Sequence, residues 1–470
     1  MQALDDAMDS YDVIVIGGGP VGENVAERAV RGGLTVALVE QELYGGECSY
    51  WACIPSKALL RPVELHAATQ RIPGLPGGDI EVEKVLARRD AFVGNWDDAG
   101  QEKWVIETGI AAVRGHGRLT GVKVVDVVSE EGTTTTLTAA HAVVVCTGTT
   151  AAIPPIAGLH EAKPWTSRDA TSMHAVPRRL AILGGGVVAC EMAQAVKGLG
   201  ADEVTILERG AGLLGRMEPW AGELVAAGLR SIGVEVRTGT QVVEVRRNGA
   251  EVTVTLEDGS TVVADEVLCA LGRRPATDQL GLETVGLQPG GYLTVDDALQ
   301  VEGTDWLYAA GDANGRALLT HMGKYQGRIC GDVIAARAAG RPDAGMRATS
   351  DHAAVPQVVF TDPQACSVGL TEAEARARGL DVRVVSYELG HVAGASLQAD
   401  DYTGRAALVV DEARRVIVGA TFVGPEVADL LHAATIAVVG EITLDRLWHA
   451  VPSFPTVSEV WLRLLEEYGL

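Results

Sequence analysis

Two cysteines that lie five residues apart are the side chains of this sequence best suited to redox chemistry. Cys48 and Cys53 occur in the segment GGECSYWACIPSK and are flanked by turn residues. Residues five apart do not stack on a regular helix, but one irregular turn brings two such cysteines within reach of a disulfide. A thiolate near a helix N-terminus is stabilised and made nucleophilic. Zinc, the alternative, needs two further ligands at short spacing, which the other cysteines do not offer. The pair therefore predicts a redox-active disulfide, and no metal site is expected.

The remaining cysteines do not indicate a disulfide framework. The chain has seven cysteines, an odd number, and most of them lie inside apolar stretches. Cys146, Cys190 and Cys269 are interpreted as small buried side chains.

A glycine-rich turn, GGGPVG at residues 17–22, links an apolar run at 11–16 to a helical stretch that ends near residue 31. Glycines at these positions allow a tight turn and let backbone N–H groups approach a pyrophosphate at the helix N-terminus. Glu40, the acidic residue at the end of the next apolar run, is placed to bond a ribose hydroxyl. The predicted nucleotide contacts are Gly17, Gly19, Pro20, Gly22 and Glu40.

The same pattern returns with an apolar run at 180–183, the turn GGGVVA at 184–189 and a second run at 204–207. Alanine replaces the third glycine and is still small enough for close packing. The carboxylate of Glu208 favours NADH, because it would repel the 2′-phosphate of NADPH, although Arg209 and Arg216 nearby could reverse this preference. Gly184, Gly186 and Glu208 are the predicted contacts. The repeat indicates two nucleotide-binding domains in an α/β protein.

Composition limits the remaining function classes. The chain has 470 residues, enough for three domains, with 47% hydrophobic residues and a net charge of −23. No basic cluster stands out, which argues against nucleic acid as a partner. No apolar run reaches membrane-spanning length, and residues 1–10 are polar and acidic without the core of a secretory signal, so a cytoplasmic location is expected. A polar stretch at 341–351 marks a boundary, beyond which short strands and then helices indicate an α+β domain.

Taken together, these motifs resemble the flavoprotein disulfide reductases, which include dihydrolipoamide dehydrogenase, glutathione reductase and mercuric reductase. The segment VVVCTGTTAAIPP at 143–155 is similar to the strand that closes the family's flavin domain. VLCALGRRP at 267–275 and YAAGD at 308–312 resemble two further family motifs, the second holding the ribityl chain of FAD through its Asp. FTDP at 360–363 and VGLT at 368–371 resemble the opening of the dimerisation domain.

The resemblance implies FAD and NAD(P)H as cofactors and two Rossmann-like domains followed by an α+β dimerisation domain. Residues 1–155 and 270–345 would bind FAD, residues 156–269 would bind NAD(P)H, and residues 350–470 would form the homodimer.

The resemblance also implies roles for individual residues. Cys53 would lie against the flavin, Cys48 would face the substrate, and Lys57 would pair with Glu191 beside the flavin N5 atom. Further cofactor contacts would be Gly46, Lys57, Thr147, Gly148, Gly272, Arg273, Gly311 and Asp312.

The C-terminal motif departs from the family. Where the family has His-Pro-Thr-x-x-Glu, with the histidine as acid–base group toward the partner's disulfide, this chain has Phe454 and, five residues later, Glu459. Phenylalanine exchanges no proton, and such a catalyst contributes roughly a hundred- to ten-thousand-fold in rate. His449 would substitute if the loop folded back. Glu459 would otherwise be structural.

Several functions are therefore compatible with the sequence. The first is a disulfide reductase of the dihydrolipoamide dehydrogenase type that delivers electrons to a small-molecule acceptor. The second is a quinone or dye reductase, or a transhydrogenase, acting at the flavin, since transhydrogenases of this family also lack the histidine. Phe454 is also similar to a ketone reductase/carboxylase, and a redox-sensing flavoprotein is the last alternative. Mercuric reductase is less favoured, because its C-terminal cysteine pair is not found before Leu470.

Overall fold

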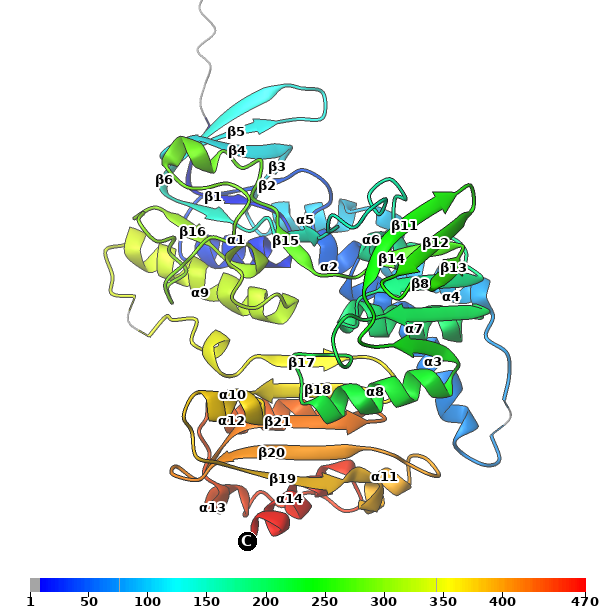
Figure 1. Ribbon diagram of the computed structural model, residues 1–470. Coiled ribbons are helices and arrows are strands. Elements are labelled where there is room, and N and C mark those ends of the chain that lie inside the picture. Colours follow the sequence, from blue (N-terminus) through cyan, green and yellow to red (C-terminus); the bar gives the residue numbers. More distant parts are fainter. Residues whose placement is uncertain (1–8, 76, 344) are drawn as a thin grey trace, which may run out of the picture. The chain divides into compact units, whose positions relative to one another are not determined.

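The computed structural model describes residues 9–75, 77–343 and 345–470 (Figure 1). Packing divides the chain into two compact units, and each is assembled from three separate segments. The first comprises the described residues of Met1–Ile54, Val93–Thr150 and Gly272–Asp351. The second comprises those of Pro55–Phe92, Ala151–Leu271 and His352–Leu470.

A seven-stranded sheet forms the centre of the first unit. Its strands are β1 (Asp9–Ile16), β2 (Val36–Glu40), β3 (Ala111–Arg114), β4 (His116–Gly121), β5 (Val124–Val128), β6 (Thr134–Val145) and β16 (Leu307–Ala309). The order is β3-β2-β1-β6-β5-β4, with β16 paired to the end of β6. Strands β3, β2, β1, β6 and β16 are parallel, and they are buried along the apolar runs that the sequence contains. The carboxyl ends of these strands therefore meet at one edge of the sheet.

Two long helices pack side by side in this unit, α1 (Pro20–Arg31) and α9 (Thr320–Ala338). Glycines allow the close approach, since a Cβ atom on Gly327 would lie 2.8 Å from the carbonyl oxygen of Val21. The other elements of the unit are α2 (Gly46–Tyr50), α5 (Ala99–Glu107), the short pair β7 (Thr149–Ala151) and β15 (Arg273–Pro275), and the 3₁₀ turns Gly94–Trp96, Leu282–Val285 and Gly311–Asn314.

The second unit contains a parallel sheet ordered β10-β9-β8-β14. Its strands are β8 (Arg179–Leu183), β9 (Glu203–Leu207), β10 (Val234–Arg237) and β14 (Glu266–Cys269). Around it lie α3 (Cys53–Gln70), α4 (Val82–Phe92), α6 (Ser167–Thr171), α7 (Val187–Gly198), α8 (Pro219–Ser231) and the antiparallel strands β11 (Val242–Asn248), β12 (Glu251–Leu256) and β13 (Thr261–Ala264). Helix α3 packs closely on α7, because a Cβ atom on Gly198 would lie 2.2 Å from the side chain of Val63.

The C-terminal part of the second unit is a five-stranded antiparallel sheet ordered β17-β18-β21-β20-β19. Its elements are β17 (Pro356–Val359), β18 (Gln364–Gly369), β19 (Val382–Glu388), β20 (Arg405–Asp411), β21 (Val416–Gly424), α10 (Glu372–Ala377), α11 (Ala393–Ser396), α12 (Leu431–Val439), α13 (Leu444–Leu447) and α14 (Val460–Tyr468), with 3₁₀ turns at Ser350–His352, Leu389–His391, Val427–Leu430 and Val457–Glu459. One apolar core joins this sheet to α12 and α14.

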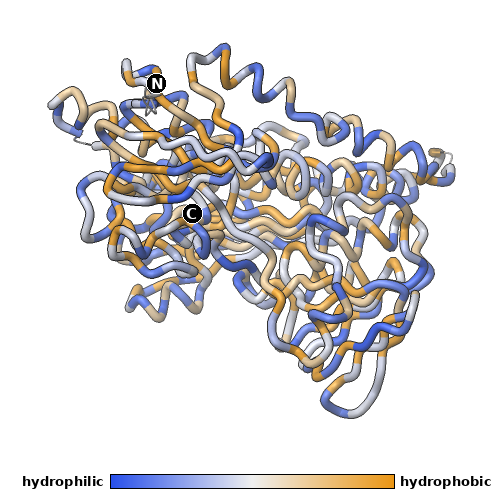
Figure 2. Tube along the Cα trace, turned by 90° about the horizontal axis from the view of Figure 1, so that it is seen from above, coloured by the Kyte–Doolittle hydropathy of each residue, from blue (hydrophilic) through white to orange (hydrophobic). Residues whose placement is uncertain are grey.

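The predicted fold class is confirmed. Both predicted strand–turn–helix–strand units form, and the C-terminal strands and helices follow in the expected order. Figure 2 shows strands that are mostly hydrophobic and helices whose colour alternates, as one buried face requires. None of the helices in the described ranges is both long and apolar enough to cross a membrane.

Candidate redox and nucleotide sites

The two cysteines of the CxxxxC segment lie on successive helices. Cys48 is part of α2, and Cys53 is the first residue of α3. Between them the helical geometry breaks at Trp51, whose φ and ψ are −137° and 0°. The break brings the two half-buried thiols together, so that they share a side-chain hydrogen bond. The structure thus contains the irregular turn that the sequence predicts.

A third side chain reaches this cysteine pair from a distant part of the sequence. The hydroxyl oxygen of Thr320, the first residue of α9, lies 3.4 Å from the sulfur of Cys53. The same hydroxyl also forms a hydrogen bond with Cys48. No motif in the sequence marks Thr320 as part of the site, because 267 residues separate it from Cys53.

The surroundings of Cys48 change the pKa of its thiol. The shared hydrogen bond with Cys53 raises the pKa of the Cys48 thiol well above its ordinary value, and burial raises it further. The hydrogen bond from Thr320 acts in the opposite direction.

The structure brings Lys57 and Glu191 together, as the resemblance implies. The Nζ atom of Lys57 lies 2.7 Å from Oε2 of Glu191, whose side chain is almost fully buried. The other oxygen of Glu191 accepts the backbone N–H of Phe360 at 3.0 Å. Lys57 also lies over the ring of Phe360, 4.9 Å from its centroid. Phe360 therefore positions both members of the pair, which the sequence did not predict.

Two glycines of the first turn, Gly17 and Gly22, have no room for a side chain. A Cβ atom on Gly17 would lie 2.4 Å from the carbonyl oxygen of Cys146, and one on Gly22 would lie 1.9 Å from the carbonyl oxygen of Gly17. Glu40, at the end of β2, accepts the backbone N–H of Gly18 at 2.7 Å. The predicted acidic residue, Glu40, and the predicted glycine turn therefore lie side by side at the start of α1.

The second glycine turn repeats this construction. Gly184 has a φ of +105°, and a Cβ atom there would lie 2.4 Å from the carbonyl oxygen of Ala270. Glu208 follows β9 and lies over the turn, since a Cβ atom on Gly185 would come within 2.9 Å of its side chain. Glu208 also accepts the backbone N–H of Gly210. Gly186 caps the N-terminus of α7, as the motif predicts.

Comparison with known proteins decides the family. The family described as "Pyridine nucleotide-disulphide oxidoreductase" matches residues 11–327, and its dimerisation domain matches residues 355–464. The chain belongs to this family. It is accordingly an FAD-dependent oxidoreductase that uses a pyridine nucleotide, with a C-terminal dimerisation domain.

Relatives of this pyridine nucleotide-disulphide oxidoreductase extend over nearly the whole chain. A mercuric reductase from Staphylococcus aureus is 30% identical over 96% of this chain and 81% of its own length. A dihydrolipoyl dehydrogenase from Chlamydia muridarum is 30% identical over 96% of both chains. Among solved structures, the Cu(II) complex of the HOCl-induced flavoprotein disulfide reductase RclA from Escherichia coli has a TM-score of 0.85 and 25% identity, covering 98% of this chain and 99% of its own. LpdA from Mycobacterium tuberculosis has a TM-score of 0.84 and 26% identity over 98% of this chain and all of its own.

The first unit of this oxidoreductase fits FAD. The space beside Gly19 stays open because residue 46 is glycine. A Cβ atom on Gly46 would lie 2.7 Å from the Cα atom of Gly19. The hydroxyl of Thr147 is buried without a hydrogen-bond partner, as expected of a group that bonds a cofactor. Both features lie among the residues predicted to contact FAD.

A hydrogen-bonded chain joins three further segments of the predicted flavin site. Arg273 donates to the hydroxyl of Thr149 at 2.6 Å, and that hydroxyl donates to Asp312 at 2.6 Å. Burial raises the pKa of Asp312. Gly148, Gly272 and Gly311 all have positive φ values next to these residues. The structure thus brings together the motifs at 143–155, 267–275 and 308–312.

The C-terminal segment of this oxidoreductase keeps the acid of the family motif but not the proton-transfer group. Phe454 is 74% exposed. Glu459 is buried, and its Oε1 atom accepts a hydrogen bond from Arg463 at 2.6 Å, whereas its Oε2 atom has no hydrogen-bond partner. His449 is exposed two residues after α13.

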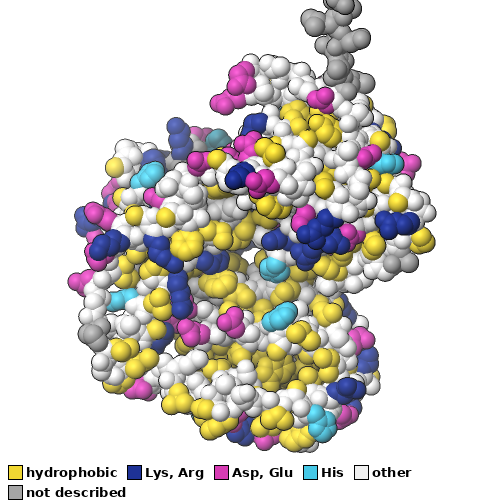
Figure 3. Space-filling model, turned by 180° about the vertical axis from the view of Figure 1, so that it is seen from behind, with side chains coloured by type: hydrophobic (Ala, Val, Ile, Leu, Met, Phe, Trp, Pro, Cys, Tyr) yellow, Lys and Arg dark blue, Asp and Glu magenta, His cyan; other side chains and the backbone are white. Residues whose placement is uncertain are grey.

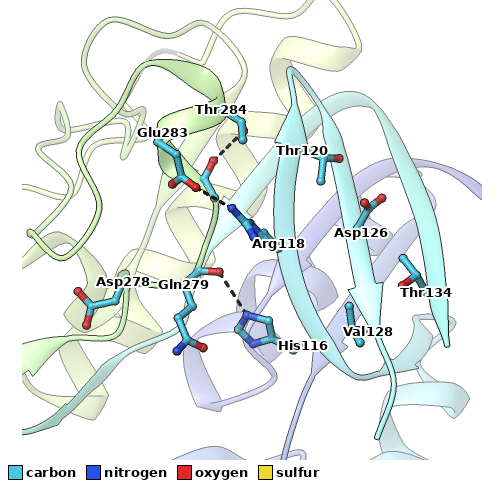
Figure 4. Close-up of a pocket in the computed structure, with 11 residues that line it drawn as sticks. His116, Arg118, Thr120, Asp126, Val128, Thr134, Asp278, Gln279, Glu283 and Thr284 are labelled. Atoms are coloured by element: carbon cyan, nitrogen blue, oxygen red, sulfur yellow. Dashed lines mark hydrogen bonds and ion pairs between the residues drawn. The ribbon is translucent and has the colours of Figure 1, made fainter. Parts of the chain in front are cut away.

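A separate pocket of about 660 Å³ lies in the first unit, between β4, β5 and the 3₁₀ turn Leu282–Val285 (Figure 4). Two of its side chains already have partners within the lining, since Arg118 bonds Glu283 at 2.7 Å and His116 bonds the backbone carbonyl of Gln279 at 3.2 Å. None of the residues predicted for redox chemistry or cofactor binding lines it. The pocket is therefore not assigned a role in the reaction.

Proposed function

We propose that this oxidoreductase passes two electrons from NADH, through FAD, to the Cys48–Cys53 pair and from there to a small-molecule acceptor. The observation that carries the proposal is the contact between the two thiols at the break between α2 and α3. In one turnover of the pair, the disulfide takes up two electrons and one proton and becomes a thiol at Cys48 and a thiolate at Cys53. The raised pKa of Cys48 supports this division.

The roles proposed for the other residues follow from their positions. FAD, when bound, supplies the two-electron link between the nicotinamide and the cysteine pair. The residues proposed to hold it lie in the two glycine-lined segments at 17–22 and 45–46 and in the hydrogen-bonded chain of Arg273, Thr149 and Asp312. Lys57 supplies a fixed positive charge one helical turn after Cys53, and Glu191 holds it in place. The domain division at about residues 155, 270 and 350 and a cytoplasmic location remain part of the proposal.

NADH is proposed as the preferred nucleotide. The Glu208 carboxylate lies over the second glycine turn in the same way that Glu40 lies over the first. A carboxylate there bonds a ribose diol and repels a 2′-phosphate, and like charges held together cost several kcal/mol. We expect NADH to reduce the protein at least about tenfold faster than NADPH.

The nature of the acceptor depends on the C-terminal segment. A disulfide acceptor needs a proton for its leaving thiolate, and the exposed ring of Phe454 cannot supply one. A quinone, a dye or another nicotinamide, reduced at the flavin, does not depend on that segment. This acceptor class is the second candidate, and the presence of Phe454 favours it.

The test is anaerobic titration of the FAD-loaded protein with NADH and NADPH, followed by thiol counting and an acceptor screen. One equivalent of NADH is expected to expose two new thiols and to produce a long-wavelength thiolate–flavin absorbance. If NADH reduces the flavin without exposing thiols, the cysteine route is wrong.

A Cys48→Ala variant separates the two acceptor classes. It is expected to lose lipoamide reduction and to keep quinone reduction. Cys366→Ala, which removes a fully buried thiol in β18, is the matched control and is expected to keep both. Lipoamide reduction that survives in Cys48→Ala would contradict the role of the pair.

A homodimer is proposed for the C-terminal domain. Large apolar side chains of this domain are exposed, and Figure 3 shows hydrophobic side chains gathered on its surface. They include Leu397, Ile436, Val439, Trp448, Val451 and Phe454. Exposed apolar groups in this number mark a contact surface, and the match to a dimerisation domain supports a second copy of the chain as the partner.

A further inference from the structure

A fully buried glutamine of α9, Gln326, bonds the 3₁₀ turn that contains Asp312. Its Oε1 atom accepts the backbone N–H of Gly311 at 2.7 Å and the side-chain amide of Asn314 at 2.8 Å. These two residues are the first and the last of the turn, so one side chain holds both of its ends. Asn314 also donates to the carbonyl oxygen of Ala309, the last residue of β16, at 3.1 Å.

An acidic residue fixes the other end of the Gln326 amide. Its Nε2 atom donates to Oδ2 of Asp351 at 2.8 Å, and the same oxygen lies 3.2 Å from Nε of Arg316. Carboxylate oxygens accept hydrogen bonds, whereas the N–H of Gly311 only donates, so these partners decide which end of the amide faces the turn. Asp351 therefore orients Gln326, and Gln326 in turn holds the backbone of Gly311.

Close packing leaves this turn little freedom to shift. Gly311 has a φ of +71°, and a Cβ atom there would lie 2.8 Å from the side chain of Val21 in α1. A Cβ atom on Gly323, three residues before Gln326, would lie 3.2 Å from the Cα atom of Gly311. A buried N–H that loses its acceptor in such surroundings cannot turn to water. Removing the amide of Gln326 must therefore displace the turn or leave the N–H unpaired.

We propose that Gln326 is a positioning residue for the flavin site, which fixes the carboxylate of Asp312 through the backbone of Gly311. The inference rests on the proposed function in taking Asp312 as a contact of FAD. Asp312 follows Gly311 directly and accepts a hydrogen bond from the hydroxyl of Thr149 at 2.6 Å, so the turn and this hydroxyl together hold its carboxylate. Contact groups supported in this way by neighbouring side chains keep a binding site in its productive geometry.

The experiment measures the affinity of the protein for FAD, so that no electron acceptor is needed. The FAD-loaded protein is diluted in steps, and the flavin that passes an ultrafiltration membrane gives the fraction released. Gln326→Met removes the amide at nearly constant length. Tyr325→Phe is the matched control on the same helix, because it loses a hydrogen bond to the carbonyl oxygen of Arg347 that lies outside the turn.

Gln326→Met is expected to raise the Kd of FAD by about tenfold or more, whereas Tyr325→Phe should remain within about twofold of the parent protein. Asp312→Ala is also expected to weaken FAD binding. Because Gln326 acts through Asp312, the two losses should not add. The double variant Gln326→Met/Asp312→Ala should bind FAD within about threefold of Asp312→Ala alone.

A reversed pair provides the rescue. Gln326→Glu brings two carboxylates together and should weaken FAD binding. Adding Asp351→Asn restores a carboxylate–amide pair in the opposite order, with a carboxylate oxygen still facing the N–H of Gly311. This double variant is expected to recover FAD affinity to within about threefold of the parent protein. If Gln326→Met does not fold, Gln326→Glu takes its place in the comparison with Asp312→Ala.

Three results would overturn the proposal. The first is a Kd of FAD for Gln326→Met that equals that of Tyr325→Phe. The second is a fully additive loss in Gln326→Met/Asp312→Ala, which would indicate a packing effect independent of Asp312. The third is a reversed pair that binds FAD no better than Gln326→Glu. Failure of the proposed flavin contact has a different signature, since Asp312→Ala would then bind FAD as tightly as the parent protein.

Discussion

Glu459, five residues after Phe454, is a buried carboxylate with one unsatisfied oxygen. Glu459 is buried, and one of its oxygens bonds Arg463 at 2.6 Å, while the other has no hydrogen-bond partner. A buried polar atom without a partner costs about 1–3 kcal/mol. We proposed above that residue 454 decides whether a disulfide acceptor can be protonated, and Phe454 cannot supply that proton.

Phe454→His is expected to introduce disulfide reductase activity, or to increase it by at least about tenfold, since general acid–base groups contribute roughly 10²- to 10⁴-fold. The measurement is NADH-dependent reduction of lipoamide and of glutathione disulfide between pH 5.5 and 8.5. The gain should vanish in Phe454→His/Glu459→Gln if Glu459 orients the new imidazole. Equal activities of the parent protein and the single variant at every pH would contradict the proposed role of residue 454.

At the scale of elements, the start of α1 contains a buried carboxylate that the sequence pattern does not explain. Glu23 lies in the first turn of the helix, where acidic residues interact favourably with the helix dipole, and accepts a hydrogen bond from Gln101 at 2.8 Å. Burial nevertheless raises the pKa of Glu23 to about 7, and the nearby Glu40 adds to this effect. Helix α1, which follows the first glycine turn, thus carries a carboxyl group whose pKa is raised to about 7.

The raised pKa of Glu23 predicts a pH-dependent stability. The unfolded chain releases this proton near pH 4.5, whereas the folded chain holds it until about pH 7. The free energy of unfolding therefore falls as pH rises through this interval, by at most about 3 kcal/mol. Glu23→Gln, which stays neutral, should be more stable than the parent protein at pH 8.5 and similar to it near pH 4.5.

Urea unfolding of the FAD-loaded protein, followed at several pH values, measures this difference. Glu27→Gln is a suitable control, since Glu27 lies on the same helix and forms a 2.6 Å surface ion pair with Arg31. An exposed pair of this kind contributes less than about 1 kcal/mol. Parallel stability curves for the parent protein and Glu23→Gln would show that folding does not raise the pKa of Glu23.

At the scale of the whole molecule, the C-terminal domain combines a closed apolar core with an apolar surface. Its five strands pack on α12 and α14, whereas Ile436 and Val439 on the outer side of α12 remain more than half exposed. Val451, in the segment before Phe454, is 85% exposed. Apolar side chains in these positions are costly in water unless a second subunit covers them.

Val451→Asp is expected to shift the protein from dimer to monomer, because a carboxylate in an apolar interface loses its hydration without gaining a partner. Light scattering coupled to gel filtration measures the mass over a range of concentrations. Ile106→Asp is the matched control, since Ile106 is 59% exposed on α5 outside the dimerisation domain. A Val451→Asp protein that remains dimeric at micromolar concentration would place the interface elsewhere.

Most of the nucleotide-binding architecture could be predicted from the sequence because its signals are local. Each glycine turn, the helix that follows it and the acidic residue at the next strand end lie within about thirty residues. Their spacing alone indicates a strand–turn–helix–strand unit, and the structure contains both units. The pairing of Lys57 with Glu191 could be predicted as well, but only from the resemblance to a family.

The sequence by itself therefore determined the fold class, the cysteine pair and the positions of both glycine turns, since steric limits and periodicity act between near neighbours. Only the tertiary structure decided which groups surround these motifs. Thr320 reaches Cys53 across 267 residues, and the backbone N–H of Phe360 reaches Glu191 across 169. Such contacts depend on how helices and sheets pack, and no local pattern of residues encodes that packing.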